Sequence, residues 1–405
     1  MIVQGTSVGL DVHALSVVAH AIDEETGKIA RARLCPDHRE VLGWLHQLRG
    51  PVRVTYEAGP TGFGLARAIN NSAGMECLVA APSKLQRPAG DRIKTDARDA
   101  AHLARLLRLG EITAVTVPAP EIEAVRDLVR ARDDARADLM RVRHRLSKLL
   151  LRQGIVYSGG TPWTCVHEAW LRKQRFAEHH LKAAFDHSFD AVLAATAARN
   201  RLDEQILDVA ASARFADPVN RLGCLRGISA LTGLALTVEI GDWSRFTGSS
   251  IGAYVGQVPS QFSSGSSRVQ GSITKAGNTH VRRLLIEAAW HHRKSYSTSG
   301  PSLRARWAKV DPALRARGHA GNRRLYSRWQ GFTERKKNPW WPTLRSRASC
   351  RAGAGRWPRC EAAAMRLGWP VDTDVGAVSE PTCGEPRSHH TIRPRSTVTL
   401  VCRQQ

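Results

Sequence analysis

Hydrophobic and polar positions in the first 115 residues follow patterns that predict a mixed α/β domain. Five segments have the alternating or continuous apolar pattern of strands: 7–11, 16–22, 28–34, 52–57 and 75–82. Three segments have apolar residues spaced three and four apart, as in helices: 38–48, 64–74 (ending near Gly74) and 94–110. Three strands followed by helix, strand, helix and strand favour a mixed sheet over a purely parallel, doubly wound one.

A long helical pattern occupies the middle of the chain. Residues 121–154 have a seam in which steps of three and four alternate, and Gly154 is expected to end the helix. This is the heptad rhythm of a coiled coil, with one polar break, and it runs through Val125, Leu128, Arg132, Ala135, Leu139, Val142, Leu146 and Leu149. A helix that packs on its own chain and a helix that dimerises both fit this seam. A second, less regular helical region spans about residues 164–215.

The last third combines helices with a serine-rich segment. Residues 222–246 resemble a helix-hairpin-helix with a Gly-containing turn at 226–229, although an ordinary helical packing unit has the same spacing. Residues 260–272 hold six serines and two glycines, and Phe262 and Val269 are their only apolar residues, so we predict a loop. A helix is predicted to follow, with Val281, Leu284, Leu285 and Ala288 on one face.

Four acidic residues stand out within the predicted α/β domain. Asp11 ends the first strand and Glu57 ends a later one, so adjacent strands would bring these carboxylates together. Asp96 and Asp99 are three apart and share one face of the first helical turn. Four clustered carboxylates repel one another unless cations lie between them, and two Mg²⁺ ions about 4 Å apart are the usual solution in phosphoryl transfer. The structural alternative is a strand-end turn at Asp11 and a helix cap at Asp96.

Composition adds a strong positive charge to this picture. The chain has 405 residues, with 60 Lys and Arg against 36 Asp and Glu, a formal net charge of +24. Such a surplus favours a polyanionic partner, nucleic acid first, although 49 Arg to 11 Lys is also what a GC-rich genome produces. We find no stretch of about 18 apolar residues and no signal-peptide pattern, and therefore expect a cytoplasmic, nucleoid-associated protein.

The acidic motifs resemble those of a known family. GLDVHALSVV, VTYEAGPTGFGLARAI and RIKTDARDAAHLARLL look like the DEDD motifs in the RuvC-like N-terminal domain of IS110-type insertion-sequence transposases. The resemblance implies an RNase H-like fold and Mg²⁺ ligands at Asp11, Glu57, Asp96 and Asp99. For the helical middle it implies a coiled-coil region that assists RNA binding and assembly into a homo-oligomer, a dimer or a tetramer.

The serine-rich segment has two interpretations from its residues alone, a flexible linker and a nucleophile. A hydroxyl near cations suits attack on a phosphodiester, and four basic residues lie nearby in the sequence: Arg268, Lys275, Arg282 and Arg283. The stretch from Gly256 to Ala289 resembles the C-terminal transposase domain of the same family, whose Ser-Gly carries the nucleophile. Aligning that dipeptide gives Ser264-Gly265, crowded by three other serines, Ser263, Ser266 and Ser267.

The resemblance extends to partners. It implies a composite site in which the carboxylates of one subunit face the serine of another, with strand transfer through a 5′-phosphoserine linkage. DNA, as element ends and target, and a structured guide RNA are the implied partners. We therefore predict a DNA transposase. Two alternatives stay open at this point: a metal-dependent nuclease of the Holliday-junction resolvase type, and a non-catalytic basic nucleic-acid-binding protein.

The C-terminal residues depart from the family pattern. Residues 339–405 are rich in Arg, Ser, Pro and Cys and have no period. A frameshift near residues 338–339 accounts for this, because allowed codons read in another frame encode VVANVAIARELPGWCWSLA, an Ala-rich helix ending in GWCW, and such a copy is expected to be inactive. A lineage-specific extension is the alternative. We expect a RuvC-like domain at 1–118, a helical coiled-coil region at 119–216, a mainly α transposase domain with a helix-hairpin-helix-like unit at 217–338, and the aberrant tail.

Overall fold

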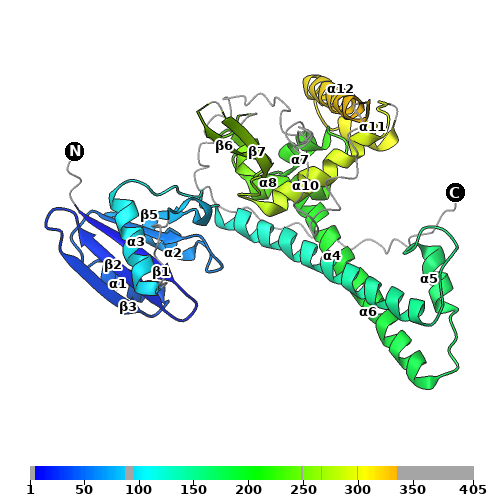
Figure 1. Cartoon of the computed structure of the whole chain (residues 1–405), viewed down its shortest axis with the longest axis horizontal. Coiled ribbons are helices and arrows are strands. Elements are labelled where there is room, and N and C mark those ends of the chain that lie inside the picture. Colours follow the sequence, from blue (N-terminus) through cyan, green and yellow to red (C-terminus); the bar gives the residue numbers. More distant parts are fainter. Residues whose placement is uncertain (1–4, 87–94, 248–249, 266, 299, 335–405) are drawn as a thin grey trace, which may run out of the picture. The chain divides into compact units, whose positions relative to one another are not determined.

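A computed structural model of the chain describes residues 5–86, 95–247, 250–265, 267–298 and 300–334 (Figure 1). The proposed frameshifted tail at 339–405, the serine at 266 and the first residue of the helical segment predicted from 94 lie outside the described residues.

The N-terminal part is built on a five-stranded mixed sheet with the order β3-β2-β1-β4-β5. The strands are β1 (Thr6–Val12), β2 (Val17–Asp23), β3 (Ile29–Leu34), β4 (Val52–Glu57) and β5 (Met75–Ala80). β1 is antiparallel to β2 and parallel to β4, while β3 is antiparallel to β2 and β5 is parallel to β4. The prediction of a mixed α/β domain is confirmed, and the arrangement is consistent with an RNase H-like fold.

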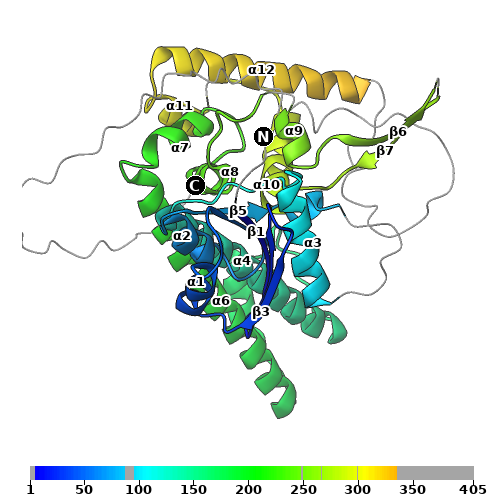
Figure 2. The same cartoon turned by 90° about the vertical axis from the view of Figure 1, so that its left-hand side faces the viewer.

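Three helices cover the two faces of this sheet (Figure 2). Val8 and Leu10 of β1 point into a core shared with α1 (His38–Leu45) and α2 (Gly64–Asn70), and α3 (Asp96–Arg108) covers the opposite face. Gly9 lies under α3, where an added Cβ would be 2.1 Å from the carbonyl oxygen of Ala100. Glycine is therefore required for α3 to approach β1 this closely.

One predicted helix boundary is wrong. We expected the helix that begins at residue 64 to end near Gly74, but α2 ends at Asn70. The side chain of Asn70 turns back to β5, where its Oδ1 accepts a hydrogen bond from the Cys77 N–H at 2.6 Å. Asn readily bonds to nearby backbone groups in this way and so favours helix ends. Gly74, with a φ of +73°, then leads into β5.

The long predicted helix is α4 (Pro120–Arg152), and it packs along α6 (His179–Ala211) of the same chain (Figure 1). Leu139 and Leu146 of the seam share a core with Phe185 and other apolar residues of α6. The polar break in the seam is also explained, since the Arg132 Nε lies 2.6 Å from Asp203 Oδ1 on α6. Packing on its own chain is thus the interpretation of the seam that the structure supports.

The remaining helices form the C-terminal part with one further core. The predicted second helical region is divided into α5 (Cys165–Arg172) and α6, and two short 3₁₀ segments occur at Pro82–Lys84 and His291–Arg293 (η2). The other helices are α7 (Ala216–Gly223), α8 (Ala230–Ile240), α9 (Ser250–Tyr254), α10 (Thr279–Trp290), α11 (Pro301–Trp307) and α12 (Pro312–Glu334). Their core also includes Val129 of α4 and Ile206 of α6. Within the described residues, none of the helices combines the length and apolar character needed to span a membrane.

The turn between α7 and α8 is engaged inside this part of the chain. The Arg226 N–H donates to Asn322 Oδ1 at 2.9 Å, and Gly227, with a φ of +81°, leaves only 2.5 Å between an added Cβ and the Ala288 carbonyl oxygen. Both features belong to a packing unit. They do not point the Arg226 N–H at a phosphate, as a helix-hairpin-helix would require.

The serine-rich segment is not the loop that we predicted. It forms a hairpin of β6 (Pro259–Ser264) and β7 (Ser267–Ile273), with Phe262 opposite Val269. Most of its side chains are exposed, so the usual sign of a strand, an apolar face for a core, is missing from the sequence. Gly265 takes a φ of +54° in the turn, which is the conformation that two-residue hairpin turns demand.

Candidate metal centre and serine hairpin

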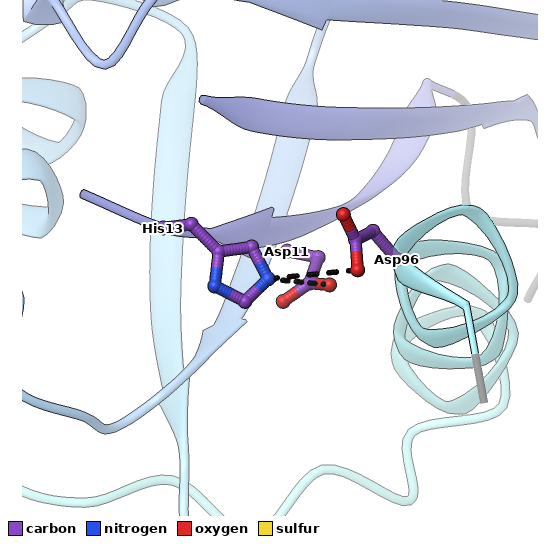
Figure 3. A group of neighbouring side chains, drawn as sticks. All are labelled: Asp11, His13 and Asp96. Carbon is purple, nitrogen blue, oxygen red and sulfur yellow. Dashed lines mark hydrogen bonds and ion pairs between the residues drawn. The ribbon is translucent and has the colours of Figure 1, made fainter. Parts of the chain in front are cut away.

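Two of the predicted metal ligands meet at the end of the sheet, together with a histidine (Figure 3). The ligand atoms of Asp11, His13 and Asp96 all lie within 4.8 Å of one another. The Nε2 of His13 is 3.2 Å from Asp11 Oδ2 and 3.8 Å from Asp96 Oδ1. Asp11 is the most enclosed of the three, with 20% of its side chain exposed, so the group forms a shallow site open to solvent.

Local structure explains how these side chains converge. Asp11 is on the same face of β1 as Gly9, because alternate residues of a strand share a face, and this is the face that α3 covers. Asp96 begins α3, and the N-cap is Thr95, whose side chain accepts a hydrogen bond from the Arg98 N–H. The carboxylate of Asp96 is therefore not used as the helix cap, which was the structural alternative for this residue.

Glu57 and Asp99 are near this group without joining it. Leu10 pairs with Tyr56 in the parallel register, so Asp11 and Glu57 each stand one residue further along adjacent strands and on the same face. Asp99 is one turn into α3, and its charge is among those that act on Asp11. Among the described residues, neither side chain places an oxygen within the Asp11–His13–Asp96 group.

Burial and like charge act together on Asp11. Burial is the largest influence and raises the pKa of Asp11 above its ordinary value. The hydrogen bond and charge of His13 lower this pKa, whereas the carboxylates of Asp96 and Asp99 raise it. A carboxylate in this setting gains from a nearby cation, which offsets both the repulsion and the lost hydration. The oxygen donors of Asp11 and Asp96 suit a hard divalent ion, so the residues present fit a metal site.

Sequence reasoning missed His13. A signal existed, because residues two apart in an extended strand lie on the same face, and Asp11 and His13 have that spacing. The ligands predicted from the sequence were all carboxylates. Imidazole is a ligand for transition metals such as Zn²⁺ or Ni²⁺ more than for Mg²⁺, so the histidine bears on which ions the site accepts.

Ser264 is exposed at the tip of the β6–β7 hairpin. It pairs with Ser267 across the two strands, and Ser263 pairs with Arg268. Of the four basic residues predicted to surround the nucleophile, Arg268 is the one that lies in the hairpin. Lys275 is at its base, with a φ of +54° and an N–H that donates to the Gly256 carbonyl at 3.0 Å.

The other two predicted cations have partners within the fold. The guanidinium of Arg282 donates to the carbonyl oxygens of Val255 at 2.8 Å and Ala276 at 3.0 Å. Arg283 forms ion pairs with Asp133 and Glu287. Arg282 therefore stabilises the base of the hairpin, and Arg283 links α10 to α4.

A buried charged residue, Glu239 in α8, anchors the same base. Its side chain has no exposed surface, and it accepts hydrogen bonds from Arg130 at 2.8 and 3.1 Å and from Asn278 at 2.7 Å. Burial alone would raise the pKa of Glu239, but the bonds from Arg130 and Asn278 outweigh burial and hold the pKa below its ordinary value. Asn278 is also the N-cap of α10. The only signal in the sequence was a lone acid within the apolar residues 230–240.

Two protein-family models match this chain. A family model described as "Transposase" (DEDD_Tnp_IS110) matches residues 8–154, and one described as "Transposase IS116/IS110/IS902 family" matches residues 219–308. The transposase for insertion sequence element IS1533 of Leptospira borgpetersenii is 30% identical over 341 residues, which cover 82% of this chain and 97% of that protein. The chain belongs to the IS110 family of transposases.

Other relatives agree with the assignment to the IS110 family. A protein of Sinorhizobium fredii (strain NBRC 101917 / NGR234), named "Putative transposase y4qE", is 38% identical over 283 residues, 70% of this chain and 69% of its own length. The transposase for IS1111A of Coxiella burnetii is 35% identical over 83 residues, 20% of this chain and 23% of its own. This IS110-family transposase is therefore a DNA recombinase, and its DEDD domain indicates dependence on a divalent metal ion.

Proposed function

We propose that this transposase cleaves and rejoins DNA at a Mg²⁺ site formed by Asp11, Glu57, Asp96 and Asp99. The convergence of Asp11 and Asp96 from β1 and α3 is the observation that carries the proposal. Glu57 supports it by its place next in register to Asp11. A bound divalent ion would stabilise negative charge on the phosphoryl oxygens. The carboxylates would hold that ion beside the scissile phosphate.

We further propose Ser264 as the nucleophile. Its Oγ forms a bond to phosphorus while the bond from phosphorus to the 3′ oxygen breaks, and the 3′ oxygen leaves as a hydroxyl that takes up the proton lost by the serine. A 5′-phosphoserine results, and attack by another 3′ hydroxyl reverses the step on a new strand. The exposure of Ser264 at the hairpin tip supports this role, and one basic residue of the hairpin, Arg268, lies on the opposite strand, where it pairs with Ser263.

Assembly and RNA guidance complete the proposal. We propose that the carboxylates of one subunit meet the serine of another and that a structured guide RNA selects the DNA. We also propose a catalytic domain at 1–118 and a transposase domain at 217–338, with residues 119–216 between them assisting oligomerisation. Because α6 covers the seam of α4, contacts between subunits would use the outer faces of α4 and α6. The support for the RNA comes from the family resemblance and from the positive charge.

Two variants test the chemistry. With Mg²⁺ and a labelled DNA substrate, we expect Ser264→Ala to abolish covalent attachment of protein to DNA, measured as a labelled band in denaturing gels. Ser263→Ala is the matched control and should keep attachment. Cleavage that persists undiminished in Ser264→Ala would contradict the serine role and favour a resolvase-type nuclease.

The metal site has its own test. We expect Asp11→Asn to lose Mg²⁺-dependent cleavage and to weaken binding of Mn²⁺, followed by electron paramagnetic resonance, by 10-fold or more, since one carboxylate ligand is lost. Asp23→Asn, at the end of β2, is the control and should bind as the wild type does. Cleavage and Mn²⁺ binding that both persist undiminished in Asp11→Asn would contradict the assignment of Asp11 as a metal ligand.

A further inference from the structure

The final described helices carry a concentrated positive charge. Residues 291–334, which contain η2, α11 and α12, have ten Lys and Arg residues and two acidic residues, whereas α4 has nine basic and six acidic residues. Both Figure 1 and Figure 2 show α12 at an outer edge of the C-terminal helices. α12 also lies beyond residue 308, where the second matched family region ends.

Neutralisation by acidic side chains differs sharply between the two regions. In α4, Arg130 pairs with Glu239, Arg132 with Asp203 and Arg136 with Glu287. Within the part of the chain that the structure describes, none of the ten basic residues of 291–334 forms an ion pair. Arg306 and Arg315 donate hydrogen bonds to backbone carbonyls, so we assign them a structural role.

Three of the other arginines form a stripe along α12. The inward face of the helix holds Gly318, Asn322 and Leu325, which are buried. At 100° per residue, the three stripe positions fall within about 40° of one another and about 100° from the middle of the inward face. They span about 16 Å along the axis. The members of this arginine stripe are Arg317, Arg324 and Arg328.

The surroundings of the stripe leave its charge uncompensated. Burial lowers the pKa of Arg324, and the like charge of Arg328 lowers it further. The residues of α12 next to the stripe are small, namely Ala313, Gly321 and Gly331, and no acidic residue of the helix lies within about 60° of it, so no carboxylate of α12 stands between the guanidinium groups and an approaching anion. A linear polyanion would relieve this repulsion.

We propose that the arginine stripe of α12 binds the phosphate backbone of duplex DNA without reading its sequence. Duplex DNA presents about one negative charge per 1.7 Å of its axis, so a 16 Å stripe faces several phosphates at once. Backbone contacts of this kind position a protein on the duplex and carry no sequence information. The inference rests on membership of a family that acts on DNA, and it does not depend on the metal site or on Ser264.

The experiment measures binding of a mixed-sequence DNA duplex between 50 and 300 mM salt, without divalent metal. For the triple variant Arg317→Gln/Arg324→Gln/Arg328→Gln we expect the slope of log affinity against log salt to fall in magnitude by about 2.7, or about 0.9 per lost contact. Near 0.1 M salt the affinity should drop by at least about 10-fold. A second, unrelated duplex should show the same losses.

Two further variants separate the stripe from bulk charge and from misfolding. Lys28→Gln/Arg39→Gln/Arg108→Gln removes three exposed charges from the N-terminal domain and should leave the slope within about one unit of the wild type. Replacing the three stripe arginines by lysine keeps the charge and should restore most of the slope. An equal loss in the N-terminal variant, an unchanged slope in the stripe variant, or a loss confined to a structured RNA probe would each overturn the proposal.

Discussion

At the scale of single residues, position in the register matters more than residue type. Asp11 and Asp96 were predictable from the sequence because acids at a strand end and in a first helical turn already imply a shared edge. Glu239 was not predicted, because its importance comes from Arg130, which is distant in the sequence, whereas His13 was missed although its spacing from Asp11 already placed the two on one face. Arg282 shows the opposite error. Its closeness to Ser264 in the sequence predicted a cation beside the nucleophile, but its guanidinium bonds to two backbone carbonyls.

Gly9 allows a sharp test of how the metal site is supported. We expect Gly9→Ala to destabilise the N-terminal domain by about 1–3 kcal/mol, because the new Cβ would meet backbone atoms of Ala100 and Ala104, which cannot give way without moving α3. Urea unfolding followed by circular dichroism measures this cost. Since α3 carries Asp96, Mn²⁺ binding should weaken as well.

Gly43→Ala provides the matched control for that experiment. Gly43 is an exposed glycine inside α1, and an added Cβ there meets nothing within 4 Å. Alanine should therefore stabilise by up to about 1 kcal/mol through helix propensity. If both variants had the same small effect, the close approach of α3 to β1 would be wrong.

His292 predicts a pH dependence of stability. Burial, followed by the charges of Arg226 and His291, lowers the pKa of His292 to about 4. The unfolded chain binds this proton below a pKa of about 6.5, whereas the folded chain resists it. The neutral, buried His292 therefore contributes its full stabilisation above pH 6.5, and this stabilisation is lost as the pH falls towards 4. At 1.36 kcal/mol per pKa unit, the free energy of unfolding should fall by roughly 3 kcal/mol.

Denaturant titrations at pH 4.5 to 7.5 would measure this loss. We expect His292→Gln to have a shallower pH dependence than the wild type, because the titrating group is gone. The exposed His180→Gln is the control and should keep the wild-type slope. A steep slope retained by His292→Gln would show that other groups cause it.

At the scale of elements, the sequence predicts the helices and strands that bury at least one face in a core. The strands of the sheet alternate or are fully apolar, and the seam of α4 repeats at heptad spacing, so both were found. The β6–β7 hairpin was not, because it is exposed on both faces and contributes no apolar pattern. The end of α2 at Asn70 depended on a side-chain bond to Cys77, which local composition does not reveal.

The seam of α4 can be tested through one buried leucine. Leu146 is fully buried, and we expect Leu146→Ala to cost about 2–5 kcal/mol in urea unfolding. Leu151 on the same helix is 53% exposed, and Leu151→Ala should change stability by less than about 0.5 kcal/mol. Because α6 of the same chain covers the seam, the unfolding midpoint should not depend on protein concentration. A midpoint that rises with concentration would point to burial between subunits.

At the scale of the whole molecule, the charge has separate origins. Residues 339–405 contain ten Arg and five acidic residues, so +5 of the +24 comes from the tail and +19 from the rest. Much of the basic charge in α4 is paired with acids, whereas that of residues 291–334 is not paired within the described chain. Total charge predicted a nucleic-acid partner, but only the structure shows where unpaired charge gathers.

The reading frame gives a prediction at this scale. If the tail is frameshifted, replacing residues 339–405 by a peptide that begins VVANVAIARELPGWCWSLA should raise excision of a marked element in cells well above that of the present chain. Thermal unfolding of the two proteins would show whether the replacement also adds stability. Equal activity and stability of both forms, or codons in the gene that do not encode this peptide in the shifted frame, would contradict the hypothesis.

One helix belongs to both of the larger helical cores. α4 places Val129 in the core shared with α8 and α10, and Leu139 and Leu146 in the core shared with α6. Neither core can open fully without breaking the helix that supports the other, so they should exchange amide hydrogens as one cooperative unit. A strain introduced where DNA meets the C-terminal helices would then be shared along α4, which would respond as a rigid lever and not as a hinge.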